Sequence, residues 1–184
     1  MSKILISGYY GFANAGDEAM LTAIIESLRQ VEKNVELTVL SGNPEDTAAK
    51  HQVCSVYRFN PLGIIRAMKD SELIISGGGS LLQDVTSKRS LLYYLSIIGL
   101  GKFFGKKVML FAQGIGPIRA KWARKLTSLV CNEADLITVR DSESAAELIE
   151  MGVKPEKITV TADSVLSLNP VTKECGQYLL QEAG

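Results

Sequence analysis

The first 28 residues combine a short apolar run, a glycine-bearing loop and a helical pattern, in that order. Residues 4–6 are Ile-Leu-Ile, which is typical of a strand buried on both faces of a sheet. Three glycines follow between residues 8 and 16, and a helix is predicted from Asp17, which favours the positive end of the helix dipole. A strand that leads through a glycine loop to a helix N-terminus is a common way for an α/β fold to build a ligand site.

The alternation of strand and helix patterns continues along the chain. Apolar, strand-like runs occupy residues 3–7, 35–40, 52–56, 73–76, 107–112, 136–139 and 158–160. Helical patterns occupy residues 17–32, 61–68, 87–104, 120–132 and 142–151. This order predicts an α/β fold, a Rossmann-like parallel sheet with helices on both faces, over residues 1–168. Residues 169–184 begin with an Asn-Pro break and carry a helical pattern at 172–182, so we expect a linker and the start of a truncated second domain.

The composition is that of a soluble globular protein, with 46% hydrophobic and 22% charged residues among 184. The cysteines at positions 54, 131 and 175 are odd in number and form no C-x-x-C pair, which favours a reducing, cytoplasmic environment. The single histidine, His51, falls in a predicted surface loop without a Cys or His neighbour. We therefore expect no metal site, and no cofactor or nucleic-acid partner is predicted.

The zero net charge hides a strongly basic interval. No acidic residue occurs between Asp84 and Glu133, while the interval contains nine lysines and arginines, so the rest of the chain carries the compensating negative charge. Such asymmetry predicts an anionic partner, and the alternative is a set of solvated helix faces. Residues 91–104 within it are apolar nearly all round but too few to span a bilayer, which takes about 20 residues. They fit a buried helix, or a peripheral membrane contact through the basic and apolar interval 88–125.

Two more glycine loops follow predicted strands. Residues 77–79 are consecutive glycines whose N–H groups can cradle an anion, and Ser80 follows them. Residues 113–117 are Gln-Gly-Ile-Gly-Pro. Because parallel strands end at one edge of the sheet, we expect all three loops to converge there on a ligand. The alternative is that these glycines only permit tight turns.

Two charged residues at this edge are the candidates for chemistry. Asp17 is predicted to face a substrate, although it is also a suitable acid for the start of a helix, and Asn14 is either a ligand contact or a turn residue. Arg140 ends a predicted strand, where a guanidinium can bind a carboxylate or phosphate through two parallel hydrogen bonds. An ion pair with Asp141 or Asp163 that only tethers the loops is the alternative.

Taken together, residues 8–18, 77–84, 113–117 and 139–141 resemble the motifs of the polysaccharide pyruvyl transferase family. The resemblance is strongest to CsaB-type members, which modify bacterial cell-wall polymers, and it runs in family order from Lys3 to about Asp163. One departure is Ala13, where glycine or a small polar residue is expected.

The resemblance implies the N-terminal half of a GT-B-type two-domain fold, with the active site between two Rossmann-like halves. It implies transfer of the enolpyruvyl unit of phosphoenolpyruvate, the donor substrate, to two hydroxyls of a sugar as a 4,6-ketal. The implied acceptor is N-acetylmannosamine of a lipid-linked cell-wall saccharide, and surface-layer proteins bind the ketal. This places the protein in the cytoplasm, at the inner face of the plasma membrane. The second half is implied to supply a histidine general acid and further arginines, so we expect the isolated chain to be inactive.

The predicted site combines these motifs. The predicted catalytic residues are Asp17 and Arg140. The predicted substrate-binding residues are Gly11, Asn14, Gly77, Gly78, Gly79, Ser80, Gln113, Gly114 and Asp163. The alternative functions are a GT-B-type sugar-nucleotide glycosyltransferase and a non-catalytic anion-binding domain, whereas the glycine spacing disfavours a dehydrogenase.

Overall fold

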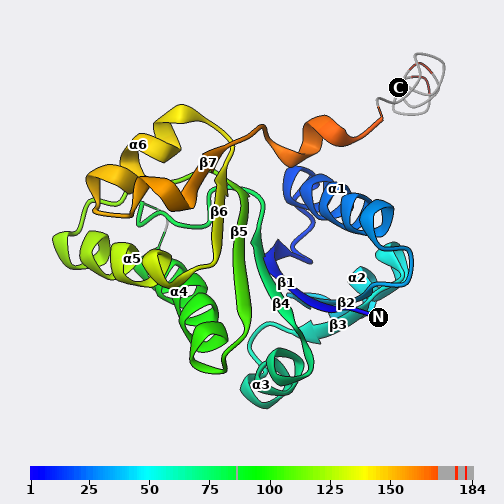
Figure 1. Cartoon of the computed structure of the whole chain (residues 1–184). Helices are drawn as coiled ribbons and strands as arrows, with labels where there is room; N and C mark the ends of the chain where they lie inside the picture. The colour runs from blue at the N-terminus through cyan, green and yellow to red at the C-terminus, as the bar shows by residue number, and fades with distance from the viewer. Residues whose placement is uncertain (86, 170–176, 178–180, 182–184) are drawn as a thin grey trace.

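The computed structural model of the chain describes residues 1–85, 87–169, 177 and 181. Seven parallel strands form one sheet in the order β3-β2-β1-β4-β5-β6-β7 (Figure 1). The strands are β1 (Lys3–Tyr10), β2 (Glu36–Ser41), β3 (Cys54–Tyr57), β4 (Leu73–Gly77), β5 (Lys107–Gln113), β6 (Leu136–Val139) and β7 (Ile158–Val160). The Rossmann-like α/β prediction is therefore confirmed, and all seven predicted strands are present.

Helices connect the strands and cover the sheet. They are α1 (Ala15–Val31), α2 (Pro44–His51), α3 (Pro61–Asp70), α4 (Lys88–Phe103), α5 (Lys121–Glu133) and α6 (Ser142–Glu150), with the 3₁₀ turns η1 (Pro155–Lys157) and η2 (Ser164–Ser167). Among the described residues, five of these six α-helices match predicted ones, and α2 was not predicted. Its only buried residue is Thr47, so it lacks the apolar periodicity on which a helix prediction depends.

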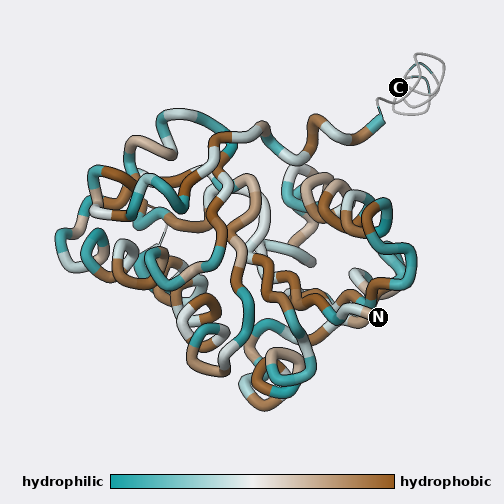
Figure 2. Tube along the Cα trace, viewed as in Figure 1, coloured by the Kyte–Doolittle hydropathy of each residue, from teal (hydrophilic) through white to brown (hydrophobic). Residues whose placement is uncertain are grey.

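The core lies on both faces of the sheet because successive strand residues point to opposite sides. Leu5 belongs to a cluster with residues of α3, α4 and α5, whereas its neighbours Ile4 and Ile6 pack with α1. Figure 1 shows α1 on one side of the sheet and α3 to α5 on the other, and Figure 2 shows the strands as mostly hydrophobic tubes between more polar helices. This double cover explains the continuous apolar runs in the sequence.

Helix α4 is largely a core helix. Leu91, Tyr94, Leu95 and Ile98 are buried against the sheet, as expected for a segment that is apolar nearly all round. At its end, however, Phe103 is 81% exposed. In the part of the chain that the structure describes, no helix is both long and apolar enough to cross a bilayer.

The region around His51 differs from the prediction of a surface loop. His51 ends α2, and its side chain is only 10% exposed because Nε2 packs 3.5 Å from Oε2 of Glu18 on α1. Of the cysteines, Cys131 is buried and Cys54 is exposed. The predicted second domain, including the helical pattern at 172–182, falls almost entirely outside the described residues and stays a prediction.

The strand order creates a crevice between β1 and β4. Chain connections run outward from this pair, through β2 and β3 on one side and through β5 to β7 on the other. Ligands of open α/β sheets bind at such a switch point, outside the carboxyl ends of the strands. After β7 the chain turns back toward α1, where η2 packs on that helix (Figure 1).

Candidate functional site

Four loops meet at the carboxyl edge of the sheet. They follow β1, β4, β5 and β6, which are consecutive neighbours in the sheet, so the predicted convergence of the glycine loops is observed. The loops after β4 and β5 are joined directly, since the N–H of Gly114 donates to the carbonyl of Gly79 at 3.0 Å. The N–H of Gly116 likewise donates to the carbonyl of Leu82 at 2.8 Å.

The loop after β1 is held by polar groups at the start of α1. Asn14 is exposed and caps the helix, because its Oδ1 accepts hydrogen bonds from the N–H groups of Gly16 and Asp17. Gly11 adopts a φ of +76°, and its N–H donates to Oε1 of Glu18 at 2.8 Å. Of the two roles considered for Asn14, the structure shows the turn and cap role. A ligand contact remains a prediction.

Tyr10 links this loop to the first glycine of the β4 loop. Its ring is buried, its hydroxyl donates to the carbonyl of Gly77 at 2.7 Å, and burial raises its pKa above the ordinary 10.0. A side chain at Gly8 would collide with the ring, since a Cβ there would lie 2.3 Å from the ring atom Cζ. Tyr10 therefore links β1 to β4 at the crevice, a role that its place in the predicted glycine loop did not indicate.

Asp17 lies directly above the β4 glycine loop. A Cβ at Gly79 would lie 3.1 Å from Oδ1 of Asp17, and Gly78 and Gly79 both have positive φ values of about +70°. Only glycine adopts this conformation without strain and permits so close an approach. Partial burial, together with the negative charge of Glu18, raises the pKa of Asp17 above its ordinary 3.8. A carboxylate in such a setting accepts a proton more readily than one in water.

Asp17 and Ser80 share a cleft of about 320 Å³. The other lining residues are Tyr9, Leu81, Gln83, Ser90 and Tyr94. One wall is thus aromatic, while the polar groups come from α1 and from the loop after β4. This combination of apolar walls and a few polar groups is typical of small-molecule sites.

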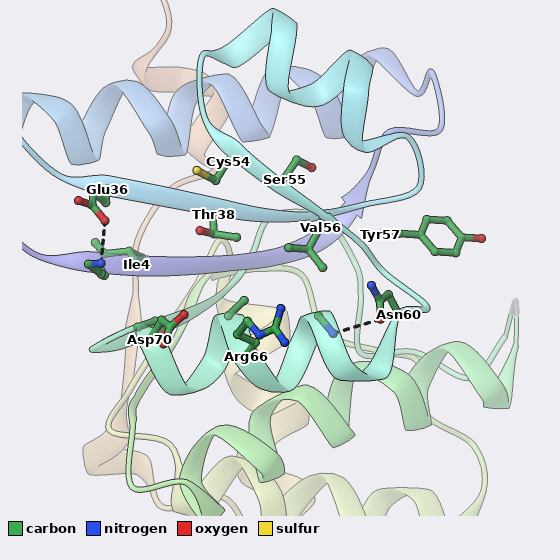
Figure 3. Close-up of a pocket in the computed structure, with 14 residues that line it drawn as sticks. Ile4, Glu36, Thr38, Cys54, Ser55, Val56, Tyr57, Asn60, Arg66 and Asp70 are labelled. Carbon is green, nitrogen blue, oxygen red and sulfur yellow. Dashed lines mark hydrogen bonds and ion pairs between the residues drawn. The ribbon is translucent and has the colours of Figure 1, made fainter.

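A second cavity of about 470 Å³ lies away from these loops, between α3 and strands β1 to β3. Figure 3 shows Cys54, Val56 and Tyr57 of β3 above Arg66 and Asp70 of α3. None of the predicted site residues lines it. We therefore place the candidate site in the smaller cleft, where the predicted residues converge.

Arg140 lies at the end of β6 and makes three contacts with side chains. Its Nη1 is 3.3 Å from Oδ2 of Asp163, its Nε is 3.4 Å from Oδ2 of Asp141, and its Nη2 is 3.3 Å from Oγ of Ser80. Arg140 therefore contacts both aspartates of the tethering alternative, while its contact with a ligand stays a prediction. Asp141 also caps α6 by accepting from the N–H of Ser144, and this bond together with Arg140 lowers the pKa of Asp141.

The two predicted site residues at the end of β5, Gln113 and Gly114, have supporting positions. Gln113 is fully buried, and its Nε2 donates to the carbonyl and the hydroxyl of Ser76, so it braces β4 beneath the loop and has no atom exposed to a ligand. Gly114 makes room for the guanidinium of Arg140, because a Cβ there would lie 2.8 Å from its Cζ. Glycine at position 114 is thus a steric requirement of the arginine.

The structure brings together most of the predicted site. The residues that meet at the cleft or at Arg140 are Asp17, Gly79, Ser80, Gly114, Arg140 and Asp163. Gly77 and Gly78 are buried and face Ile24, Met20 and Tyr10 instead. Gly11, Asn14 and Gln113 support the surrounding loops instead. Within the described ranges, no three His, Cys, Asp or Glu side chains are grouped as metal ligands.

Sequence reasoning missed Arg58, which is 5% exposed and follows β3 at the same edge. Five aromatic rings surround its guanidinium, including those of Tyr9 and Tyr94 from the cleft wall. A signal did exist in the sequence, since Arg58 stands between Tyr57 and Phe59 just after an apolar run.

This parallel sheet, with glycine loops and a cleft at its carboxyl edge, defines a Rossmann-like domain. Similar solved structures are GT-B glycosyltransferase and epimerase folds. Anabaena HepE in complex with UDP and glucose is 12% identical with a TM-score of 0.62, over 100% of this chain and 50% of that chain. UDP-GlcNAc 2-epimerase from Neisseria meningitidis bound to UDP-GlcNAc is 12% identical with a TM-score of 0.57, over 90% of this chain and 47% of that chain. The lipopolysaccharide outer core galactosyltransferase WaaB is 16% identical with a TM-score of 0.51, over 94% of this chain and 46% of that chain.

These identities establish the fold alone, and this chain spans about half the length of each structure. The family model for polysaccharide pyruvyl transferases matches residues 14–174. This chain belongs to the polysaccharide pyruvyl transferase family. The family resemblance is thereby confirmed, while its CsaB-type refinement stays a prediction. No curated protein matches the sequence significantly.

Proposed function

We propose that this chain is the N-terminal half of an enzyme that transfers the enolpyruvyl unit of phosphoenolpyruvate to a sugar as a 4,6-ketal. Membership of the polysaccharide pyruvyl transferase family supports a polysaccharide-modifying transferase. The observation that carries the assignment to this cleft is the position of Asp17, a carboxylate of raised pKa directly above the glycine loop of β4.

The proposed reaction forms two C–O bonds and breaks one. The first sugar hydroxyl adds its oxygen to C2 of phosphoenolpyruvate, while C3 gains a proton and becomes a methyl group. The second hydroxyl then displaces phosphate from C2, and its proton leaves with the phosphate. Asp17 accepts a hydroxyl proton or stabilises the positive charge that develops at C2.

Phosphoenolpyruvate carries a carboxylate and a phosphate, so its site needs cations and N–H donors. Arg140 provides a cation at the carboxyl edge of the sheet, beside the exposed Ser80. The N–H groups of Gly78, Gly79, Gly114 and Gly116 do not form the anion cradle expected from the sequence, because each donates to an acceptor within the protein. The contact between Nε of Arg140 and Oδ2 of Asp141 is 3.4 Å long. An incoming anion can therefore replace the Asp141 carboxylate at the guanidinium at little cost in free energy. The second half of the fold supplies the remaining cations and the general acid for C3. The isolated chain therefore has half of a site and no activity of its own.

The acceptor in this proposal is N-acetylmannosamine of a lipid-linked cell-wall saccharide, as in the CsaB type, which locates the enzyme at the cytoplasmic face of the plasma membrane. The exposed Trp122 and the basic residues Arg89 and Lys121, at the starts of α5 and α4, support a peripheral membrane contact. The ketal then gives the polymer the negative group to which surface-layer proteins bind.

The test is phosphate release from phosphoenolpyruvate by the full-length protein, with a lipid-linked N-acetylmannosaminyl disaccharide as acceptor. Asp17→Ala and Arg140→Ala are each expected to reduce acceptor-dependent release by about 100-fold or more. Leu62→Ala, which removes an exposed side chain on α3, is the matched control and is expected to leave the rate unchanged.

A glycosyltransferase of the same fold gives the opposite pattern. Turnover of a nucleotide sugar, with no phosphate release from phosphoenolpyruvate for any pyranose acceptor, contradicts the proposal. Full activity of both site variants contradicts the placement of the active site at Asp17 and Arg140.

A further inference from the structure

Arg58 is a buried cation beside the cleft. Its backbone N–H donates to the carbonyl of Ser41 at 2.9 Å, which extends the pairing of β3 with β2 to the carboxyl edge of the sheet. The side chain is 5% exposed, and its Nη2 makes only a long hydrogen bond of 3.4 Å to the hydroxyl of Tyr94. Because Tyr94 and Tyr9 also line the cleft, the guanidinium lies just behind the cleft wall.

The charge of Arg58 has no anionic partner within the described part of the chain. No carboxylate there lies within 4.0 Å of its guanidinium, and Nε and Nη1 are buried without a well-formed hydrogen bond. The nearby Tyr93 hydroxyl does not replace an acid, since burial raises its pKa to about 12 and keeps it neutral. Burying a cation without a counter-charge is unfavourable, so this arrangement costs stability.

Aromatic rings are what the guanidinium contacts instead. The ring centroids lie 4.4 Å (Tyr93), 5.2 Å (Phe59), 5.3 Å (Phe12), 5.5 Å (Tyr94) and 5.9 Å (Tyr9) from its Cζ. Cation–π contacts offset part of the cost of burial. These cation–π contacts do not use the N–H groups of the Arg58 guanidinium. Those N–H groups remain suited to hydrogen bonds with a carboxylate or phosphate.

Several of these rings are also open to solvent. Tyr9 and Phe12 stack on each other at 4.4 Å and are each 41% exposed, and Phe59 is 61% exposed. An exposed aromatic cluster around a buried cation is more than a stable core requires, because rings that only shield the charge would themselves be packed. The faces of such rings attract the slightly positive C–H groups of a sugar ring.

We propose that Arg58 and the rings of Tyr9, Phe12 and Phe59 form a subsite for a phosphorylated sugar. The rings bind the pyranose, and the Arg58 guanidinium binds the phosphate when Tyr9 and Phe12 shift aside. The assignment to a sugar rests on the proposed function, in which Asp17 on the same cleft accepts a proton from a sugar hydroxyl. A sugar held by these rings reaches Asp17 through the cleft that Tyr9 and Asp17 both line.

Binding to the 184-residue chain tests this subsite without any turnover. Calorimetric titration uses N-acetylglucosamine 1-phosphate as the probe, with N-acetylglucosamine and inorganic phosphate as its two halves. The sugar phosphate is expected to bind at least about tenfold more tightly than either half, since only it uses both the rings and the guanidinium. Arg58→Met and Phe59→Ala are each expected to weaken its binding by about tenfold or more. Matched controls are Arg66→Met and Leu62→Ala, which remove a guanidinium and an exposed apolar side chain from α3 outside the cluster.

Thermal unfolding separates recognition from a purely structural role. Arg58→Met is expected to retain its thermal stability, because the loss of the cation–π contacts is offset by removal of an unpaired buried charge and by thioether contacts with the rings. If Arg58→Met fails to fold, Phe59→Ala still tests the subsite. The Phe59 ring is mostly exposed, so its removal is not expected to prevent folding. Unchanged sugar-phosphate binding in Phe59→Ala, or in a folded Arg58→Met, overturns the subsite.

Two further outcomes also overturn it. One is the absence of sugar-phosphate binding to the wild-type chain, and the other is tighter binding of uridine monophosphate than of the sugar phosphate, which indicates a nucleotide site. Failure of phosphate release from phosphoenolpyruvate, with sugar-phosphate binding that depends on Arg58, contradicts the proposed reaction but supports the subsite. The two proposals are therefore distinguishable.

Discussion

Asp17 is placed where its charge is disfavoured. It is half-buried above the glycine loop after β4, beside Glu18, and its pKa is raised by both effects. A carboxyl group with a raised folded-state pKa destabilises the protein at pH values above that pKa, where it must be ionised. The same shift makes it a better proton acceptor, so the proposed function and stability oppose each other at this position.

We predict that Asp17→Asn raises the midpoint of thermal unfolding at pH 7 while abolishing phosphate release. The gain in free energy of unfolding is expected to be no more than about 1 kcal/mol, because water screens a half-exposed charge. It is expected to shrink as the pH falls through the raised pKa and to vanish below the ordinary value of 3.8. Thermal melts from pH 3 to pH 8 measure this difference, with the exposed Glu26→Gln on the same helix as control. A gain that grows toward acid pH contradicts the assignment.

Gly114 is a second position at which adding a single side-chain atom is expected to change the site. A Cβ there would lie 2.8 Å from the guanidinium carbon of Arg140, so Gly114→Ala displaces the end of that side chain. Because only a flexible terminus moves, we expect a small change in stability but a loss of phosphate-release activity of about tenfold or more. Gly99→Ala on α4 is the control, since a Cβ there meets nothing within 4 Å. It is expected to stabilise the chain by about 0.5–1 kcal/mol and leave the activity unchanged. Equal activities of the two variants contradict the role of Gly114.

At the scale of helices and strands, predictability follows the strength of the local signal. The five inner strands are largely buried and leave apolar runs, and the short edge strands β3 and β7 were predicted as well although none of their residues is buried. Helix α2 buries little more than Thr47 and leaves no periodic pattern. The meeting of the glycine loops was predictable because parallel strands share one edge. The Arg58 cluster was not, because its rings come from the β1 end, the β3–α3 loop and α4, and sequence does not show which of them meet.

Asp135 connects three elements at the opposite edge of the sheet. Its carboxylate accepts hydrogen bonds from Lys102 of α4 at 2.6 Å, from Lys107 of β5 at 3.1 Å and from the N–H of Val108 at 2.9 Å. Burial alone would raise its pKa, but these bonds outweigh burial and lower it to about 2. A depressed folded-state pKa means that the contribution to stability is present above the ordinary value of 3.8. It is lost as the pH falls toward 2.

We therefore predict that Asp135→Asn lowers the free energy of unfolding at pH 7 by about 1 kcal/mol, a value reduced for partial exposure. The deficit relative to wild type is expected to disappear between pH 4 and pH 2, as the native carboxylate becomes protonated. Urea titrations across this range measure it, and Glu133→Gln, an exposed position two residues earlier, is the control. A deficit that persists unchanged at pH 2 shows that Asp135 acts through packing instead.

At the scale of the whole molecule, some cations of the basic interval form ion pairs in the folded chain and others stay exposed. Asp135 pairs with Lys102 and Lys107, and Glu147 and Glu150 pair with Arg124, so part of the excess positive charge is neutralised internally. The remaining cations divide between two edges of the sheet. Helices α4 and α5 both begin at the carboxyl edge, so the exposed residues in their first turns lie on the same edge as the cleft. Phe103 and Lys106, at and after the end of α4, lie at the opposite edge.

This division predicts which surface binds an anionic membrane. In the proposed function, an acceptor carried on a lipid has to reach the cleft, so we expect the contact at the carboxyl edge, where Arg89, Lys121 and the 47% exposed Trp122 lie at the starts of α4 and α5. Each basic residue near an anionic surface contributes about 1 kcal/mol, so changing Arg89 and Lys121 to Gln is expected to weaken binding by about 30-fold. The assay is cosedimentation with vesicles of phosphatidylglycerol and phosphatidylcholine at low salt. Changing Lys33 and Lys69 to Gln removes the same charge at the opposite edge, where α1 and α3 end, and is expected to have a much smaller effect. Equal losses for the two pairs indicate attraction by net charge alone, without an oriented contact, and contradict a membrane surface at the cleft.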